Sequence, residues 1–365
     1  MARHKPTPVQ LPPHTALPEE VVRAVGKPQG PDDDRPGRRV TVTGSLREGR
    51  RTDPGTATAH GIGGGAALVD VHFQDRATII GVGVLELPQG GIALVDTGPE
   101  ARLDALRAGL AELGHSLQDV RAILLSHIHL DHATAAGAIV REAPGAIVHV
   151  HAVGAPHMAD PSRLLASAGR IYGDAMATLW GEFLPVPRAS LRVVDEGDVV
   201  SLGGRRFEVG YVPGHAKHHV AYFEAATGTA WVGDVGGIRI RGGPTIPVTP
   251  PPDIDVELWK ASMGRVMAWE PERIVATHFG PYRARRSHFA ALSAELDAWA
   301  GWVRDSLGDS SFADDRRRAH TFSDWVTARL GEKIPEGHMA LYATASGFFD
   351  SWWGLARYWR KRGAA

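Results

Sequence analysis

The sequence of 365 residues contains no cysteine. This absence excludes disulfide bonds, thiolate zinc sites and a cysteine nucleophile. Any metal ion must therefore be held by histidine, aspartate or glutamate, and 18 histidines are available. The chain also lacks an excess of charge, since 40 Lys and Arg stand against 41 Asp and Glu. Neither nucleic acid nor an anionic membrane is favoured as the main partner.

Long apolar runs are missing as well. No uninterrupted apolar segment is long enough to cross a bilayer, and the N-terminal "MARHKPTPVQLPPH" lacks the apolar centre of a signal peptide. We therefore expect a cytoplasmic protein without stable membrane association.

Composition changes near residue 66. Residues 1–65 are rich in Pro, Gly and charged residues, which predicts a mostly disordered leader. After it, apolar runs typical of strands alternate with segments of helical periodicity, so we expect an α/β protein with mixed sheets. We expect a catalytic domain over residues 66–300 and a helical C-terminal extension over residues 301–365.

The stretch "ILLSHIHLDHA", residues 123–133, places four potential metal ligands directly after an apolar run. If that run is a buried strand, they occupy the loop at its C-terminal end, where α/β proteins usually place chemistry. His127 and His129 can then point towards one metal ion, while Asp131 and His132 turn back towards a second position. Imidazole and carboxylate ligands suit zinc, iron or manganese. The alternative is a polar loop that only caps a helix.

The motif "SHIHLDH" resembles the His-x-His-x-Asp-His signature of the metallo-β-lactamase fold superfamily. Four further segments resemble other motifs of that family, in the same order along the chain: "IALVDTGP", "YVPGHAKHHVAY", "AWVGDV" and "IVATHFGP". The resemblance implies a four-layer αβ/βα sandwich with the site at one edge of its two sheets. It also implies two divalent metal ions, with zinc as the first expectation and iron or manganese as alternatives.

The resemblance also implies a role for each residue. His127, His129 and His215 would hold the first ion, Asp131, His132 and His278 the second, and Asp234 would bridge both. Asp131 and Asp234 would also be the catalytic residues. Asp96, in "IALVDTGP", would not be a ligand but would orient the motif loop through hydrogen bonds.

Several other residues allow two interpretations. His218 and His219 could bind metal or substrate, although supporting hydrogen bonds are the simpler role, and the same holds for His149 and His151. The aromatic residues of the helical insertion at about 160–184 could line a substrate pocket but more often belong to the core. The Pro- and Gly-rich segment 236–255 could be a lid over the site or a surface connection.

For the function, we expect hydrolysis of a small-molecule ester, thioester or lactone by a metal-bridging hydroxide, as in the glyoxalase II-like and lactonase-like prokaryotic members of the family. One alternative is a mononuclear iron enzyme of the persulfide dioxygenase kind. Another is a non-enzymatic scaffold with the same fold.

The stretch "LYATASGFFDSWWGLARYWRKR", residues 341–362, forms one apolar stripe if it is helical. The stripe could pack on its own domain, cover a partner subunit or lie on a membrane. Because such aromatic stripes normally need burial, we expect the segment to contribute to a homodimer or to the rim of the pocket.

Overall fold

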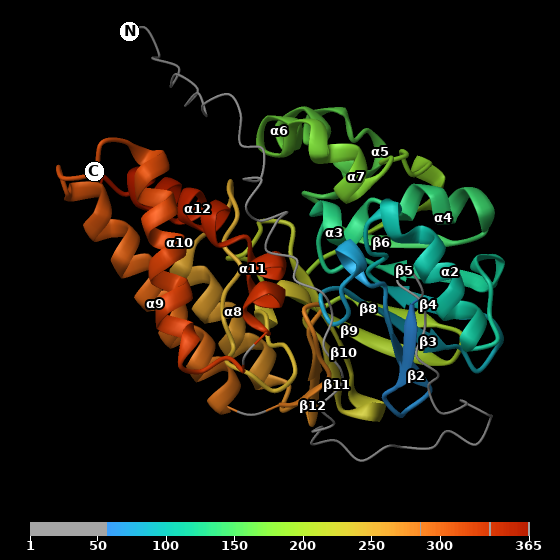
Figure 1. Ribbon diagram of the computed structural model, residues 1–365. Coiled ribbons are helices and arrows are strands. Elements are labelled where there is room, and N and C mark those ends of the chain that lie inside the picture. The colour runs from blue at the N-terminus through green and yellow to red at the C-terminus, as the bar shows by residue number, and fades with distance from the viewer. Residues whose placement is uncertain (1–56, 285, 336, 364–365) are drawn as a thin grey trace, which may run out of the picture.

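Two mixed β-sheets face each other, and helices cover the outer side of each (Figure 1). The computed structural model describes residues 57–284, 286–335 and 337–363. The two facing sheets with their outer helices confirm the αβ/βα sandwich expected from the sequence. Most of the predicted leader lies outside the described residues. Residues 57–65, the last part of the predicted leader, are described, and residues 58–61 form a strand of the first sheet.

The first sheet has seven strands, which follow one another in chain order. They are β1 (Thr58–Gly61), β2 (Ala66–Asp70), β3 (Gly81–Glu86), β4 (Ile92–Val95), β5 (Val120–Leu124), β6 (Ile147–His151) and β7 (Leu191–Val194). Strands β1 to β4 pair antiparallel, whereas β4 to β7 pair parallel. Parallel pairing needs a crossover. The helices α2 (Leu103–Glu112) and α4 (Ala136–Glu142) lie in the connections from β4 to β5 and from β5 to β6.

The second sheet has six strands, in the order β13-β12-β11-β10-β9-β8. They are β8 (Val199–Leu202), β9 (Arg205–Tyr211), β10 (Val220–Glu224), β11 (Thr229–Trp231), β12 (Arg273–Val275) and β13 (Tyr282–Arg283). Only β11 and β12 pair parallel, and helix α8 (Val256–Ala268) connects them.

Alternating side chains of the strands separate the inner core from the outer one. In β4, Ala93 and Val95 pack towards the second sheet, where they join Phe207 and Trp231. Ile92 and Leu94 belong instead to the cluster that includes the covering helices. This period of two is what a strand buried on both faces requires.

The remaining helices form two groups. The first group follows β5 and β6 and comprises α3 (Leu130–Ala133), α5 (Ala155–Ala159), α6 (Ser162–Tyr172) and α7 (Met176–Trp180). The second group lies on the side of the second sheet, in orange and red in Figure 1, and comprises α9 (Arg286–Gly308), α10 (Asp315–Gly331), α11 (Met339–Ser346) and α12 (Phe348–Lys361). Helix α9 continues through the predicted boundary at residue 300. The division into domains itself stays a prediction.

The aromatic stripe of α12 is covered by the chain itself. Phe348, Trp352 and Leu355 are fully buried in the core that α9 and α10 share. Trp352 Nε1 donates to Ser306 Oγ at 3.2 Å, and Trp359 Nε1 donates to the Ala300 carbonyl at 2.7 Å. Of the three alternatives, packing on its own domain is the one observed, so the stripe no longer argues for a homodimer. The homodimer itself stays a prediction.

None of the helices in the described residues combines the length and the apolar character that a membrane span would require.

Candidate metal centre

The loop and short helix that follow β5 carry four of the candidate ligands. His127 and His129 lie between β5 and α3, outside regular secondary structure. His129 directly precedes α3 and has an extended backbone. Asp131 and His132 lie in the first turn of α3, a short helix that the sequence interpretation had placed within the loop. The change from extended to helical backbone after His129 separates the two pairs of side chains.

The other three candidates follow strands of the second sheet. His215 comes after β9, Asp234 lies in the 3-10 turn 233–236 after β11, and His278 comes after β12. Only glycine fits at position 214, directly before His215. Its φ is +129°, and an added Cβ would lie 2.2 Å from the backbone nitrogen of Trp259 in α8. Both sheets therefore direct these residues to one edge of the sandwich.

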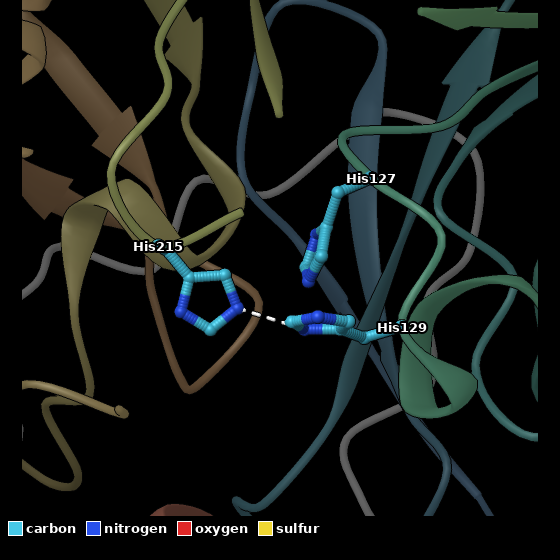
Figure 2. A group of neighbouring side chains, drawn as sticks. All are labelled: His127, His129 and His215. Atoms are coloured by element: carbon cyan, nitrogen blue, oxygen red, sulfur yellow. Dashed lines mark hydrogen bonds between the residues drawn. The ribbon is translucent and has the colours of Figure 1, made fainter. Parts of the chain in front are cut away.

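The structure brings all seven candidates together in overlapping groups, within each of which the possible ligand atoms lie within 4.8 Å of one another. The groups are His127, His129 and His215; His127, His132 and Asp234; and Asp131, His132 and His278. Figure 2 shows the first group, in which the three rings converge and His215 Nε2 lies 2.9 Å from His129 Nδ1. The grouping matches the sorting implied by the resemblance, while the binding of metal by these residues stays a proposal.

Asp234 lies between the first and the last group. Its Oδ2 is 3.4 Å from His215 Nε2 and 4.0 Å from His127 Nε2. Its Oδ1 is 3.3 Å from His132 Nε2 and 3.5 Å from His278 Nε2. One oxygen thus faces each group, which is the arrangement that a bridging carboxylate needs.

Four inner atoms of the cluster fit metal ions because they are buried and make no hydrogen bond. His127 Nε2, His132 Nε2, His278 Nε2 and Asp234 Oδ1 have no hydrogen-bond partner among the described residues. A buried polar atom without a partner costs free energy. A cation bound among these donors would remove that cost, and the set of nitrogen and oxygen donors suits zinc, iron or manganese.

Two of the candidate histidines, His215 and His278, have their outer nitrogens held by carbonyl acceptors. His215 Nδ1 lies 2.9 Å from the carbonyl oxygen of Val248, and His278 Nδ1 lies 2.7 Å from that of Ile79. A carbonyl oxygen only accepts, so each of these Nδ1 atoms carries a proton. The lone pair of the neutral ring is then on Nε2, which points into the cluster, as a metal ligand requires.

Asp96 accepts four hydrogen bonds that tie the two sheets together. Its Oδ1 accepts from the Ser126 backbone N–H at 2.7 Å. Its Oδ2 accepts from Ser126 Oγ at 2.9 Å, Thr277 Oγ1 at 3.0 Å and His132 Nδ1 at 2.8 Å. Asp96 thus contacts the residues next to His127 and His278 as well as His132 itself, and it is not a member of the ligand groups. This is the orienting role that the resemblance implied.

His218 and His219 also support the cluster. His218 Nδ1 accepts from the Ile128 backbone N–H at 3.4 Å, and His219 Nε2 accepts from the Asp234 backbone N–H at 3.1 Å. Each of them holds the backbone of a segment that carries candidate ligands. The simpler interpretation from the sequence therefore describes their contacts.

Burial and neighbouring carboxylates shift the pKa values of the histidines in opposite directions. Burial lowers the pKa of His127 well below the usual value and that of His129 to about 3, so both rings are neutral. Burial also opposes the charged form of His132, but the negative charges of Asp131, Asp234 and Asp96 outweigh it and raise the pKa well above the usual value. Without a metal, the cluster therefore holds protons on the side of Asp131.

The cluster meets solvent on one side only. The side chains of His127, His132 and His215 are 0% exposed, whereas that of Asp131 is 22% exposed. His129 is also partly exposed. The exposed side of the cluster is therefore the one that carries Asp131 and His129.

Other residues singled out in the sequence lie outside the ligand groups. His151 stacks on Tyr211 with ring centroids 4.5 Å apart and lies 3.6 Å from Asp195. Trp180 stacks on Phe73, and Tyr172 packs edge-on against Trp180. His149 is not among the ligand groups either, and Phe183 is buried in the core. The aromatic residues of the insertion therefore contribute to packing.

The segment 236–255 is largely buried and is therefore not a surface connection. Ile238, Ile240, Ile246 and Thr249 are fully buried, and the Val248 carbonyl lies against His215. The alternation of Ile and Val with polar residues in this Pro-rich segment was the signal that could have indicated its burial.

Comparison with known proteins agrees with this geometry. The sequence profile of the Metallo-beta-lactamase superfamily matches residues 79–278, a range that contains Asp96 and all seven candidate ligands. The chain belongs to the metallo-beta-lactamase superfamily.

Two curated members of the superfamily match part of the chain. A metallo-beta-lactamase fold-containing protein of Sulfurisphaera tokodaii is 29% identical over 118 residues, which are 32% of this chain and 44% of that protein. A hydroxyacylglutathione hydrolase of Maricaulis maris is 37% identical over 117 residues, which are 31% of this chain and 40% of that protein. The matched segments thus span less than half of each relative.

Solved structures of the superfamily share the fold over more of the chain. A metallo-beta-lactamase family protein of Thermus thermophilus has a TM-score of 0.56 at 23% identity and covers 78% of this chain and 89% of its own. A beta-lactamase domain protein of Burkholderia ambifaria has a TM-score of 0.55 at 19% identity and covers 84% and 88%. At these identities the likeness shows the fold alone.

Proposed function

We propose that this superfamily member is a metal-dependent hydrolase that acts on a small ester, thioester or lactone. The observation that carries the proposal is the position of Asp234, with one carboxylate oxygen facing each of two groups of donors. A site of this kind can hold two cations close together, and such pairs are typical of hydrolytic centres.

In this proposal His127, His129 and His215 would hold one divalent ion, and Asp131, His132 and His278 would hold the other. Asp234, which faces both groups, would serve as a ligand shared by the two positions. Zinc is the first expectation, because its usual ligands in proteins without thiolates are imidazole and carboxylate. Iron or manganese would accept the same donors.

When bound, such ions would supply a water molecule of lowered pKa as the nucleophile and would polarise the oxygen of a substrate carbonyl. The chain itself supplies rigid positions for the donors, since Asp96, Val248 and Ile79 fix the orientation of three imidazoles. His127 and His132 are fully buried and shield the cluster from bulk water, whereas the partly exposed Asp131 lies on its open side. Hydrolysis adds water across the acyl C–O or C–S bond and releases an acid together with an alcohol or a thiol.

The substrate class is the finer part of the proposal. The hydroxyacylglutathione hydrolase of Maricaulis maris, which is 37% identical over the matched segment, supports an acylated thiol as our first candidate. Lactones and oxygen esters follow, because they present the same carbonyl carbon to attack.

The test is Asp234→Asn, assayed with a panel of thioester, lactone, β-lactam and phosphodiester substrates in the presence of zinc, manganese or iron. Loss of a group that positions metal is expected to lower turnover by about a hundredfold or more. Asp195→Asn is the matched control, since Asp195 is an exposed carboxylate beside His151. Wild-type turnover in Asp234→Asn, with unchanged metal content, would refute the assignment.

The same panel separates the two alternatives. One iron per chain together with consumption of oxygen would replace the hydrolase by a mononuclear dioxygenase. A chain that binds no divalent metal and turns over none of the substrates would be a scaffold.

A further inference from the structure

The segment 236–255 connects the C-terminal helices to two of the candidate ligands. Towards the cluster, the Val248 carbonyl accepts from His215 Nδ1 at 2.9 Å. The Asp255 backbone N–H donates to the carbonyl of Gly214, next to His215, at 2.8 Å. The Arg239 backbone N–H donates to the His278 carbonyl at 2.7 Å. The segment therefore contacts His215 and His278 or their neighbours at three points.

On its other side, the segment is held by α11. The Tyr342 hydroxyl donates to the Pro244 carbonyl at 2.8 Å and accepts from the Ile240 backbone N–H at 3.0 Å. Ser346 Oγ donates to the Pro247 carbonyl at 3.2 Å. These contacts fix the residues that lead up to Val248.

Helix α12 holds the next residue. Thr249 Oγ1 donates to the Ser351 carbonyl at 3.1 Å, and the Thr249 backbone N–H donates to Ser351 Oγ at 3.4 Å. Thr249 and Ser351 are both 0% exposed. The pair of hydrogen bonds is therefore shielded from water, and water cannot readily replace either bond if it is lost.

The backbone of α12 also touches the segment directly at Gly354. A Cβ at this position would lie 2.0 Å from the Thr249 carbonyl oxygen and 2.9 Å from the carbonyl carbon of Pro250. Both of these atoms belong to the backbone, so the contact cannot be relieved by a side-chain rotation. Any larger residue at 354 must move α12 away from the segment.

We propose that Thr249 and Ser351 are positioning residues, through which the C-terminal helix α12 holds the Val248 carbonyl against His215 Nδ1 and so orients His215 towards the first metal position. The inference rests on the metal centre of the proposed function. It assigns to the C-terminal helices a part in that centre, although α12 lies outside the range that matches the superfamily profile.

The physical reason is the dependence of a metal ligand on its outer partner. The carbonyl of Val248 keeps the proton of His215 on Nδ1 and fixes the plane of the ring. Loss of such a partner typically lowers metal affinity by about 10- to 100-fold. A shift of the 249 backbone would move the Val248 carbonyl, because the two residues share a peptide bond.

Two matched pairs of variants test the inference. Thr249→Val removes the hydroxyl donor at nearly constant volume, whereas Thr249→Ser keeps it. Gly354→Ala introduces the Cβ that would meet Thr249, whereas Gly301→Ala adds a methyl group to α9 where no atom lies within 4 Å. The second pair therefore separates displacement of the segment from the general effect of an alanine in a helix.

The first measurement is the affinity for each of two zinc or cobalt ions, by titration of the metal-free full-length chain against a chromophoric chelator. We expect Thr249→Val and Gly354→Ala to weaken one of the two affinities by about tenfold or more, and Thr249→Ser and Gly301→Ala to match the wild type. Unchanged affinities in both Thr249→Val and Gly354→Ala, when the wild type binds two ions, would overturn the inference and leave the proposed function standing.

The second measurement does not depend on metal. In metal-free protein with 15N-labelled histidine, the His215 signals are identified by their loss in His215→Gln, and their nitrogen shifts report which ring nitrogen carries the proton. We expect an Nδ1–H form in the wild type and in Thr249→Ser, and a mixture of forms in Thr249→Val. An unaltered Nδ1–H form in Thr249→Val would contradict the inference, whether or not the wild type binds metal. Failure of the wild type to bind metal would refute the proposed function instead.

Discussion

Replacing Asp96 by asparagine should weaken the second metal position more than the first. The side chain keeps its shape but exchanges one acceptor oxygen for an amide that only donates. Oδ2 accepts from three donors, among them His132 Nδ1, and Oδ1 accepts from the Ser126 backbone N–H. The amide group therefore faces a donor in either orientation. It is expected to face Ser126, since that choice leaves three bonds in place.

The magnitude follows from these contacts. A buried N–H of Ser126 that loses its acceptor costs about 1–3 kcal/mol of the free energy of unfolding. His132 keeps an acceptor, but a neutral one, and it loses the negative charge that helps to raise its pKa. Weakening an outer partner of a ligand lowers metal affinity by about 10- to 100-fold, which corresponds to about 1.4–2.7 kcal/mol.

The assay is a titration of metal-free Asp96→Asn with zinc, together with chemical denaturation of the same protein in a chelator. Asp195→Asn serves as the control, because it also removes a carboxylate beside a histidine, at an exposed position 3.6 Å from His151. We expect a larger loss of affinity at the position that His132 shares with Asp131 and His278. Metal affinities equal to those of the wild type, in a variant that has lost stability, would show that Asp96 serves the fold and not the centre.

Other predictions concern single groups. His127→Ala and His278→Ala should each lower the amount of metal bound per chain, as measured by elemental analysis. His218→Ala is the control and should keep its metal, because His218 makes its hydrogen bond to a backbone N–H. If either of the first two variants retained two ions, that residue would not be a ligand. Metal binding should release protons and weaken as the pH falls, because the pKa values of His132 and His278 are raised in the metal-free cluster. Calorimetry in buffers of different ionisation enthalpy measures the number of protons released. Binding without proton release would contradict the charge assignment. Burial raises the pKa of Asp350 from 3.8 to about 6, so its carboxylate destabilises the fold above that pH and the penalty fades as the pH falls towards 3.8. Asp350→Asn should therefore gain up to about 3 kcal/mol in free energy of unfolding at about pH 8 and about 1 kcal/mol at about pH 4.5. Denaturation in a chelator at both pH values tests this, and an equal gain at the two would contradict it.

The sequence by itself determined the candidate ligands and the class of fold. The run before "SHIHLDH" is a buried strand, β5, and the ligands follow it because chemistry at a strand end needs only local chain geometry. The helical periodicity of residues 100–115 likewise corresponds to α2. Patterns of this kind reflect interactions between residues close in the chain, which a single sequence displays.

The tertiary structure alone decided which distant residues pack on these segments or form hydrogen bonds with them. The apolar stripe on α12 is visible in the sequence, but its cover, α9 and α10, is not, because periodicity shows which face of a helix is apolar and not what packs on it. The same holds for the orientation of His215, which depends on Val248. It holds again for Thr249 and Ser351, which are separated by 102 positions in the chain. Contacts across such distances are fixed by the packing of whole elements, and only the folded chain contains that information.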